Sequence, residues 1–382
     1  MKKLFRAAWK IAAWCVCRLF PVNSKKVVIS SYYGRGYGDN LKYVADKLLA
    51  SGKKLKIVWL VNSDSEKQSL PEGIKTSKVT SAAAIYHLST AKVWMDNCRK
   101  GFVMFKRKKQ MYIQTWHGFA LKRLEKDACN SLSDKYIRDA KSDSRRIDHI
   151  ISDSTFMTGI YKSAFWYDGD ILEWGSPRND IIINPSDELK NKVFEYFNLS
   201  EGKKIVLYAP TFRADLSNDA YSLDYKRLQK ACAKRFDGDF AVLVRLHPNI
   251  IKNCDSMDFD TNNIVNASYY PDMQELLAVA DIVVSDYSSL MFDFALSFKP
   301  CFQFATDIED YKKDRNFYFD IEALPFNLSK SNDELENSIL NFDEDKYKVK
   351  LGEFYDSVGM IKDGDSSEKC AELVLKTCCG DK

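Results

Sequence analysis

The sequence predicts an α/β protein of two domains. Its 382 residues are too many for one ordinary hydrophobic core, so two domains are the natural expectation. From Lys26 onward, short apolar runs typical of buried strands alternate with amphipathic helical patterns. Glycine, hydroxyl or histidine residues follow several of these strands, and open α/β sheets bind ligands at the carboxyl ends of their strands. We therefore look for function at those ends.

Composition excludes several classes of function. A net charge of +4 is too small to indicate a nucleic-acid-binding surface, and we expect no nucleic-acid partner. None of the ten cysteines forms a CxxC pair, and no Cys/His cluster has zinc-finger spacing. Scattered cysteines in a long chain without a secretion signal indicate reduced thiols in the cytoplasm.

No metal or cofactor is expected. Asp-Gly-Asp occurs three times and resembles the metal-binding DxD pattern of some glycosyltransferases, at residues 168–170, 237–239 and 363–365. All three copies fall in predicted turns, where Asp and Gly are favoured for backbone reasons.

Residues 1–24 are expected to form an amphipathic helix in a membrane interface. The first twenty residues carry five cations and no acid, mixed with aromatic side chains, which suits an anionic lipid surface. The longest uncharged run, Ile11–Cys17, is far shorter than the roughly 20 residues that a bilayer needs. A signal peptide fits poorly, because Arg18 interrupts the apolar region and no small-residue cleavage site follows. The alternative is a helix packed on the first domain.

A second membrane-binding segment is predicted at Gly101–Lys109, where an apolar patch adjoins four cations. This pairing favours anionic lipid, although a solvated loop between two strands is equally consistent. Both segments point to peripheral attachment at the cytoplasmic face of a membrane.

His117 is the candidate catalytic residue of the first half. The strand Met111–Thr115 leads directly into it, and the adjacent Gly118 lets a backbone approach closely. The chain has only four histidines, and we interpret His87 and His149 as structural.

The glycine-rich stretch Tyr33–Asn40 follows the first strand. It lacks the G-x-G-x-x-G spacing of a dinucleotide loop, so NAD binding is rejected. A loop that admits an acceptor is the preferred interpretation.

In the second half, Asp281–Pro300 reads as a strand, a polar turn and a helix that ends at Lys299. The hydroxyls of Ser288 and Ser289 and the helix N-terminus could hold a diphosphate. Asp293, about 5 Å further along by the helical pitch, could take ribose hydroxyls. The alternative is an ordinary strand–helix unit with serine as its N-cap.

Two more strand ends are expected at the same edge. Thr211 and Arg213 follow the strand Lys204–Ala209, and His247 follows Phe240–Leu246. Cations and hydroxyl donors that converge in this way form an electrostatic clamp for phosphate.

The turn-rich loop Gly175–Asp180 suits a domain hinge. We expect domains at residues 25–182 and 183–350. Residues 351–382 are expected to form a helical segment that packs back across both.

Six motifs in order resemble one family, over roughly residues 26–330. They are Thr115-Trp116-His117-Gly118, Gly175-Ser176-Pro177-Arg178-Asn179-Asp180, Ala209-Pro210-Thr211-Phe212-Arg213, Arg245-Leu246-His247-Pro248, Ser285-Asp286-Tyr287-Ser288-Ser289 with Phe292-Asp293, and Phe317-Tyr318-Phe319-Asp320. As a set they resemble the CDP-glycerol glycerophosphotransferases that prime and extend teichoic acids. The length looks more like the primases or short transferases than the longer polymerases. Phe119-Ala120 departs from the Thr-Pro usual after the WHG sequence, and Asn316 stands where Gly is common.

The resemblance implies a GT-B fold, in which two Rossmann-like domains face a cleft. It implies a CDP-glycerol donor, a lipid-linked saccharide acceptor and peripheral membrane attachment. His117 would be the catalytic base, His247 a second catalytic and phosphate-binding residue, and Asp293 a nucleotide-binding residue. The remaining donor phosphate contacts would be Thr211, Arg213, Ser288 and Ser289, with further donor or acceptor contacts from Gly118, Arg178, Arg245 and Arg315.

The expected reaction transfers glycerol phosphate, or a related polyol phosphate, to an acceptor hydroxyl and releases CMP. One alternative is a glycosyltransferase or epimerase of the same fold that uses a nucleotide sugar. The other is a non-catalytic membrane scaffold.

Overall fold

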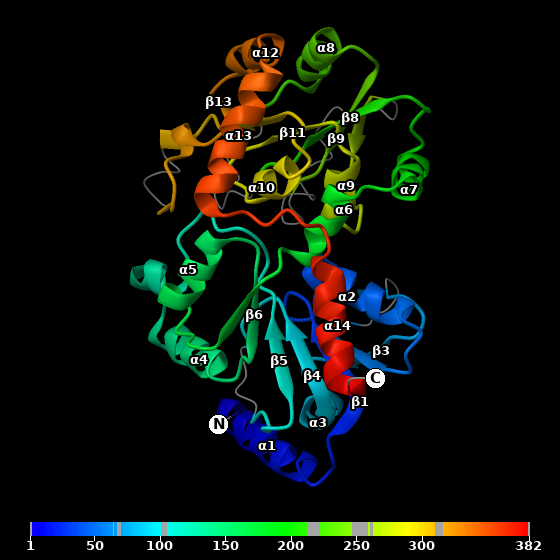
Figure 1. Ribbon diagram of the computed structural model, residues 1–382, viewed down its shortest axis with the longest axis vertical. Helices are drawn as coiled ribbons and strands as arrows, with labels where there is room; N and C mark the ends of the chain where they lie inside the picture. The colour runs from blue at the N-terminus through cyan, green and yellow to red at the C-terminus, as the bar shows by residue number, and fades with distance from the viewer. Residues whose placement is uncertain are drawn as a thin grey trace. The chain divides into compact units, whose positions relative to one another are not determined.

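The computed structural model describes residues 2–63, 65–66, 70–100, 105–211, 222–246, 259, 263–309 and 316–380, with backbone alone for 2–8 and 129–131. The chain divides into two compact units (Figure 1). Unit 1 comprises Met1–His117, Leu124–Asp180 and Asp363–Lys382, and unit 2 comprises Gly118–Arg123 and Ile181–Lys362.

Unit 1 contains a seven-stranded parallel sheet in the order β3-β2-β1-β4-β5-β6-β7. Its strands are β1 (Asn23–Ser30), β2 (Lys56–Val61), β3 (Lys75–Lys78), β4 (Ala91–Asp96), β5 (Met111–Gln114), β6 (His149–Ser152) and β7 (Asp170–Glu173). The inner strand β1 contains the β-branched run Val27-Val28-Ile29, which is buried on both faces of the sheet, as parallel sheets require. The strand order reverses between β1 and β4, which is the point where doubly wound sheets bind their ligands.

The helices of unit 1 are α1 (Lys2–Cys17), α2 (Asp39–Ala50), α3 (Ala82–Thr90), α4 (Asp134–Ser144), α5 (Thr155–Ala164) and α14 (Ser366–Cys379), with the short turns η2 (Glu125–Ser131) and η3 (Pro177–Asn179). Serine side chains cap three of them at the N-terminus: Ser81, Ser133 and Ser154. The one-turn helix α6 (Asp180–Ile183) follows η3 directly.

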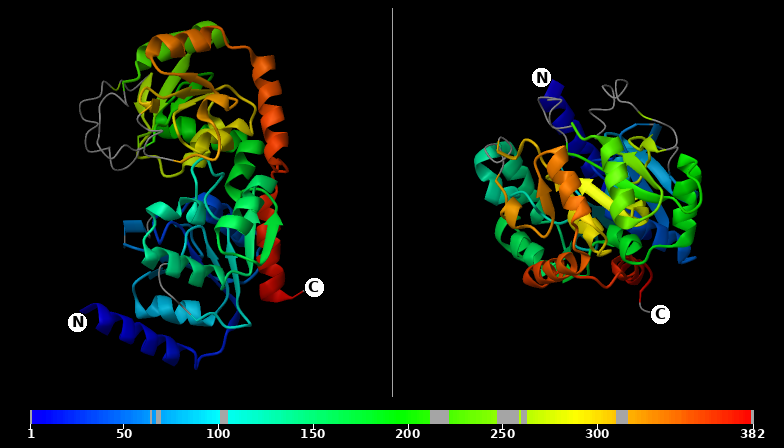
Figure 2. Two further views of the ribbon diagram at one scale, coloured as in Figure 1. Left: turned by 90° about the vertical axis from the view of Figure 1, so that its left-hand side faces the viewer. Right: turned by 90° about the horizontal axis from the view of Figure 1, so that it is seen from above.

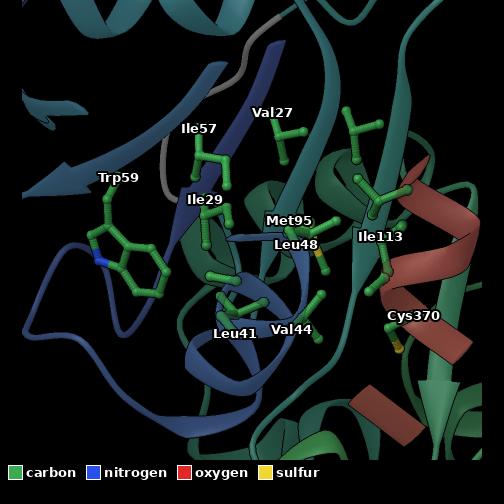
Figure 3. Close-up of a cluster of buried hydrophobic side chains, with 14 of the residues drawn as sticks. Val27, Ile29, Leu41, Val44, Leu48, Ile57, Trp59, Met95, Ile113 and Cys370 are labelled. Atoms are coloured by element: carbon green, nitrogen blue, oxygen red, sulfur yellow. The ribbon is translucent and has the colours of Figure 1, made fainter. Parts of the chain in front are cut away.

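The core of unit 1 lies between the sheet and the helices α2 and α14 (Figure 3). Buried Leu41, Val44 and Leu48 of α2 meet the apolar side chains of β1, β2, β4 and β5. Helix α14 adds Cys370, Ala371, Val374 and Cys378 to the same cluster. Its N-terminus is anchored by the Asp180 carboxylate, which accepts hydrogen bonds from the backbone N–H groups of the first two helical residues at 3.1 and 2.7 Å.

Unit 2 contains a six-stranded parallel sheet in the order β10-β9-β8-β11-β12-β13. Its strands are β8 (Lys204–Tyr208), β9 (Phe240–Val244), β10 (Ile264–Asn266), β11 (Ile282–Ser285), β12 (Cys301–Phe304) and β13 (Asn327–Ser329). Its helices are α7 (Asp187–Phe197), α8 (Tyr225–Phe236), α9 (Met273–Val279), α10 (Leu290–Ala295), α12 (Asn332–Leu340) and α13 (Glu344–Val358), with the turn η6 (Ile321–Ala323). The order again reverses at the first strand of the unit, between β8 and β11. The predicted α/β class with two Rossmann-like units is confirmed.

One detail of the prediction needs correction. The helix expected to reach Lys299 ends at Ala295, and Phe298 beyond it has left-handed backbone with φ of 57°. Within residues 351–382, expected to pack back across both domains, the end of α13 belongs to unit 2 and α14 belongs to unit 1.

Helix α1 lies beside the end of the unit 1 sheet at which β4 and β5 begin (Figures 1 and 2). Its Trp14 is buried and meets Trp94 edge to face, with ring centroids 6.3 Å apart. The Arg107 guanidinium donates to the carbonyl oxygens of Cys17 and Phe20. Packing on the first domain, the alternative stated above, is therefore observed. Several apolar side chains of the same segment stay exposed: Trp9, Ile11, Val16, Leu19 and Phe20. Among the described residues, no helix has the length and apolar character needed to span a bilayer.

Candidate active site

His117 follows β5 at the carboxyl edge of the unit 1 sheet and is half-buried. Its Nδ1 lies 2.7 Å from the backbone oxygen of Asn97, which follows the neighbouring strand β4. A carbonyl oxygen only accepts hydrogen bonds, so Nδ1 carries the proton and Nε2 of the neutral ring keeps its lone pair. The ring stacks on Trp116, with centroids 4.3 Å apart and an interplanar angle of 27°. The imidazole is thus held as a neutral base with Nε2 as its basic atom.

Next to His117 lies a buried ion pair between Asp39 and Arg178. The guanidinium NH1 is 2.7 Å from Asp39 Oδ2, and the two side chains are only 5% and 7% exposed. The hydroxyl of Tyr32 also donates to Asp39 Oδ2 at 2.7 Å. The Tyr32 ring in turn lies 5.6 Å from the His117 ring.

The side chain of Asn40 links the backbone before His117 to the turn that carries Arg178. Its Nδ2 donates to the carbonyl oxygens of Thr115 and Trp116 at 3.3 and 3.1 Å. Its Oδ1 accepts the backbone N–H of Arg178 at 3.0 Å. One buried amide therefore fixes the backbone just before His117 and the turn that carries Arg178.

The backbone at this edge is strained. Tyr32, Asp39 and Trp116 have φ values of 41°, 59° and 49°, which side chains other than glycine rarely adopt. Such strain persists only where the surroundings determine the conformation, and it gathers at functional sites.

Burial and charge set the protonation states here. Burial lowers the pKa of His117, and the positive charge of Arg178 lowers it further, while the Asn97 carbonyl and the charge of Asp39 act in the opposite direction. The pKa of Asp39 lies below its usual range because Arg178, His117 and the donated hydrogen bonds outweigh its burial. At neutral pH the site therefore holds a neutral imidazole beside an ionised carboxylate.

At the switch point of unit 2, Thr211 is bonded to Asp286. The Thr211 N–H donates to Oδ1 and Oδ2 at 2.9 and 3.1 Å, and its hydroxyl donates to Oδ2 at 2.9 Å. Thr211 was predicted to contact phosphate, but in this structure its N–H and its hydroxyl both donate to a carboxylate of unit 2.

Ser288 and Ser289 precede α10 and are half-buried. The Ser289 hydroxyl makes no capping hydrogen bond, and Ser288 Oγ accepts the N–H of Leu290 at 3.4 Å. Because α10 has only six residues, it aligns few peptide dipoles, and the hydroxyls are the better anion donors.

Asp293 is 2% exposed, and its Oδ2 accepts the side-chain amide of Gln274 at 3.2 Å. Asp293 lies on α10, the helix predicted after the polar turn, and its side chain contacts α9. Sequence reasoning did not identify Gln274 as its partner.

Of the other predicted contacts, Gly118 has φ of 111°, a conformation that favours glycine. Arg245 donates to the backbone oxygens of Ala267 and Tyr270, which gives it a structural task. Burial lowers its pKa. Arg213, His247 and Arg315 lie outside the described residues, as do residues 101–104 of the predicted second membrane segment. Within the described part of the chain, no three His, Cys, Asp or Glu side chains are grouped to hold a metal ion.

A family model described as CDP-Glycerol:Poly(glycerophosphate) glycerophosphotransferase matches residues 12–376. The chain belongs to this family. The resemblance inferred from the six motifs is thereby confirmed.

Several relatives of this chain are named as teichoic acid polymerases or transferases. The teichoic acid poly(glycerol phosphate) polymerase of Staphylococcus epidermidis is 32% identical over 93% of this chain and 51% of that protein. The polymerase of the same name from Bacillus subtilis is 31% identical over 98% of this chain and 52% of its own length. The chain thus spans about half the length of these two relatives. The teichoic acid glycerol-phosphate transferase of Staphylococcus aureus is 27% identical over 93% of this chain and 94% of that protein.

Among solved structures, the wall teichoic acid polymerase TagF superposes with a TM-score of 0.84 at 30% identity, covering 99% of this chain and 97% of that one. A histidine variant of that polymerase was also determined after a soak with CDPG. The UDP-GlcNAc 2-epimerase of Neisseria meningitidis, at 12% identity and a TM-score of 0.53, shares the fold alone.

Sequence reasoning missed the residues that surround His117. Asp39 and Asn40 were included in a loop interpreted only as an acceptor entrance, and Asn97 was not considered. A polar Asp-Asn pair that ends a glycine-rich turn after the first strand was the available signal.

Proposed function

We propose that this chain is an enzyme that transfers glycerol phosphate, or a related polyol phosphate, from a CDP-activated donor to a hydroxyl of a lipid-linked saccharide acceptor in teichoic acid or capsule-type polymer synthesis. Family membership and the names of the relatives support the reaction class. The single observation that carries the chemistry is the bond from His117 Nδ1 to the Asn97 carbonyl. It leaves Nε2 as a base at the carboxyl edge of a doubly wound sheet.

In the proposed reaction the acceptor hydroxyl oxygen attacks the β-phosphorus of CDP-glycerol. A new P–O bond forms to the acceptor, and the bond from the β-phosphorus to the bridging oxygen breaks. CMP leaves with that oxygen, and His117 Nε2 takes the proton of the attacking hydroxyl.

On the donor side, Ser288 and Ser289 supply hydroxyl donors for the diphosphate, and Asp293 is retained as the nucleotide contact. Arg213, His247 and Arg315 stay sequence predictions for the same task. We propose a smaller part for Thr211 in donor binding, because its N–H and its hydroxyl both donate hydrogen bonds to Asp286. We further propose that residues 25–182 bind the acceptor and residues 183–350 the nucleotide.

We also propose that the enzyme binds the cytoplasmic face of a membrane containing anionic lipid. The exposed apolar side chains of α1 and the cations of its segment support this location. Trp14 would hold the helix to unit 1 while Trp9, Ile11 and Val16 face lipid.

The test incubates the protein with CDP-glycerol, CDP-ribitol or UDP-sugars and a lipid-linked disaccharide acceptor, with mass spectrometry of the acceptor. Addition of one or more glycerol phosphate units, with one CMP per unit, is expected. His117→Gln should lower turnover by at least about 100-fold and leave CDP-glycerol binding nearly unchanged. The structural histidine variant His87→Gln is the control. Turnover of UDP-sugars alone, or unchanged turnover in His117→Gln, would reject the assignment.

A further inference from the structure

The carboxylate of Asp39 places a negative charge near His117, and the proposed reaction gives it no role. Asp39 begins helix α2, directly after the glycine-rich loop, and its carboxylate is buried. Three groups hold that carboxylate in place: Arg178 NH1 and the Tyr32 hydroxyl on Oδ2, each at 2.7 Å, and the Asn40 N–H on Oδ1 at 2.7 Å. A carboxylate that receives three hydrogen bonds in a buried setting stays ionised and does not move freely.

The connection from Asp39 to His117 is short. Tyr32 donates to Asp39 through its hydroxyl and packs its ring against the imidazole. The adjacent Asn40 is bonded to the two carbonyl groups that precede His117 in the chain. At the start of α2, Asp39 therefore supplies charge near the imidazole, and Asn40 fixes the backbone just before His117.

We propose that Asp39 is a positioning residue that provides the counter-charge for His117 when the imidazole takes a proton from the acceptor. This inference rests on the proposed role of His117 as base. In the resting site, Arg178 balances Asp39, so the ring stays neutral and able to accept a proton. In the transition state the new imidazolium gains the attraction of a carboxylate that is already fixed, which costs no rearrangement.

The other groups that face His117 have different parts. Glu125 of η2 adds negative charge near the ring, although its carboxylate is already bonded to Arg99. Cys98 Sγ lies 3.9 Å from Nδ1, and burial and nearby carboxylates raise the pKa of its thiol, so it stays neutral. Trp116 contributes its ring face. Asp39 and Arg178 are therefore the pair to test, because removing the charge of one or of the other should change the pKa of His117 in opposite directions.

The experiment titrates His117 by NMR of the imidazole protons in the full chain. The chain has only four histidines, and the resonance that disappears in His117→Gln identifies the ring. Asp39→Asn keeps the shape of the side chain and removes its charge, so the His117 pKa should move down. Arg178→Gln should move it up. Asp46→Asn, an exposed position on the same helix, should leave it unchanged.

Turnover provides the second measurement. With CDP-glycerol and acceptor, Asp39→Asn should lower kcat about tenfold or more, equivalent to roughly 1.4 kcal/mol of transition-state stabilisation. CDP-glycerol affinity should change less than about threefold. The acid limb of the pH profile should move in the same direction as the NMR pKa, and Asp39→Glu should restore part of the rate. A residue that only supports the fold would not give shifts of opposite sign in the Asp39 and Arg178 variants.

Folded variants with an unmoved His117 pKa would overturn the inference, whatever reaction the protein performs. If Asp39→Asn does not fold, the Arg178→Gln shift alone decides, and a shift downward or none contradicts the proposal. Opposite shifts in a protein that does not turn over CDP-glycerol would leave the charge coupling standing and reject the proposed function instead.

Discussion

The Thr211 N–H donates a hydrogen bond to Asp286 Oδ1, and the Thr211 hydroxyl donates one to Asp286 Oδ2, each at 2.9 Å. We therefore expect the hydroxyl to hold Asp286 rather than to bind a phosphate oxygen. The carboxylate also accepts the N–H of Tyr287 at 2.6 Å. Asp286 therefore fixes the end of β8 to the end of β11 at the switch point of unit 2.

Thr211→Val should consequently have little effect on donor binding. We expect CDP-glycerol affinity to change less than about threefold, while unfolding free energy falls by about 1 kcal/mol through the lost hydroxyl bond. Ser289→Ala removes a hydroxyl that makes no capping hydrogen bond to α10. This variant should weaken CDP-glycerol affinity more than Thr211→Val does. Isothermal titration of both variants and thermal unfolding measure the two effects. A larger affinity loss in Thr211→Val would show that Thr211 contacts the phosphates directly.

The pH dependence of turnover should report a base with a low pKa. His117 works only when neutral, and burial lowers its pKa from the ordinary value. As pH falls, the rate should stay near its maximum until below the unperturbed value of about 6.5, and decline only then. The pH profile of kcat/KM for CDP-glycerol measures this limb. A limb centred above pH 7 would contradict the neutral resting state described for the imidazole.

Asp96 should make unit 1 less stable as pH rises. Burial raises the pKa of this carboxyl to about 7, although the nearby Lys100 ammonium draws it down. The unfolded chain has the ordinary value near 3.9. Between those values the folded state binds the extra proton, so this contribution to stability is complete below about pH 4 and is lost as pH rises to 7.

In Asp96→Asn the decline of the midpoint of thermal unfolding between pH 4 and 7 should be smaller than in the unaltered protein. The slope is the measurement, because losing the partner of Lys100 also changes the absolute midpoint. Asp168→Asn, at an exposed position between α5 and β7, is the matched control and should keep the original slope. Equal slopes in all three proteins would reject the raised pKa.

Helix α14 should be essential for the stability of unit 1. Val374 is fully buried in the cluster formed with α2, β1 and β4. Val374→Ala should lower the free energy of unfolding by about 1–3 kcal/mol, through lost burial and the cavity left behind. Val349→Ala on α13, a position 61% exposed, should change it by less than about 0.5 kcal/mol. Denaturant unfolding of both variants compares them, and equal losses would mean that α14 does not close this core.

The alternation of strands and helices predicted both sheets, because each central strand is a buried apolar run that stands out in the sequence. The edge strand β3, Lys-Thr-Ser-Lys, was missed because it has no such run. The end of α10 was placed too late, because a phenylalanine gives no local signal for the left-handed backbone found at Phe298.

At the candidate site, the sequence predicted His117 from its place after a strand. The Asp39–Arg178 pair could not be predicted in that way, because 139 residues separate its members along the chain. Phe119, which departs from the family motif, packs among Phe292, Phe319 and Phe354 of unit 2. Its hydrophobicity was visible in the sequence, but its aromatic neighbours become adjacent only when the chain folds.

Because α14 completes the core of unit 1, the two units finish at different moments of synthesis. The ribosome has made every residue of unit 2 by Lys362, whereas unit 1 still waits for the helix that begins at Ser366. Until α14 is made, the apolar side chains of α2 and the sheet that it covers lack part of their packing, and exposed apolar surface of this kind favours aggregation. Helix α14 is thus made after unit 2 is complete, yet it closes the core of unit 1, whose first strands are made before unit 2.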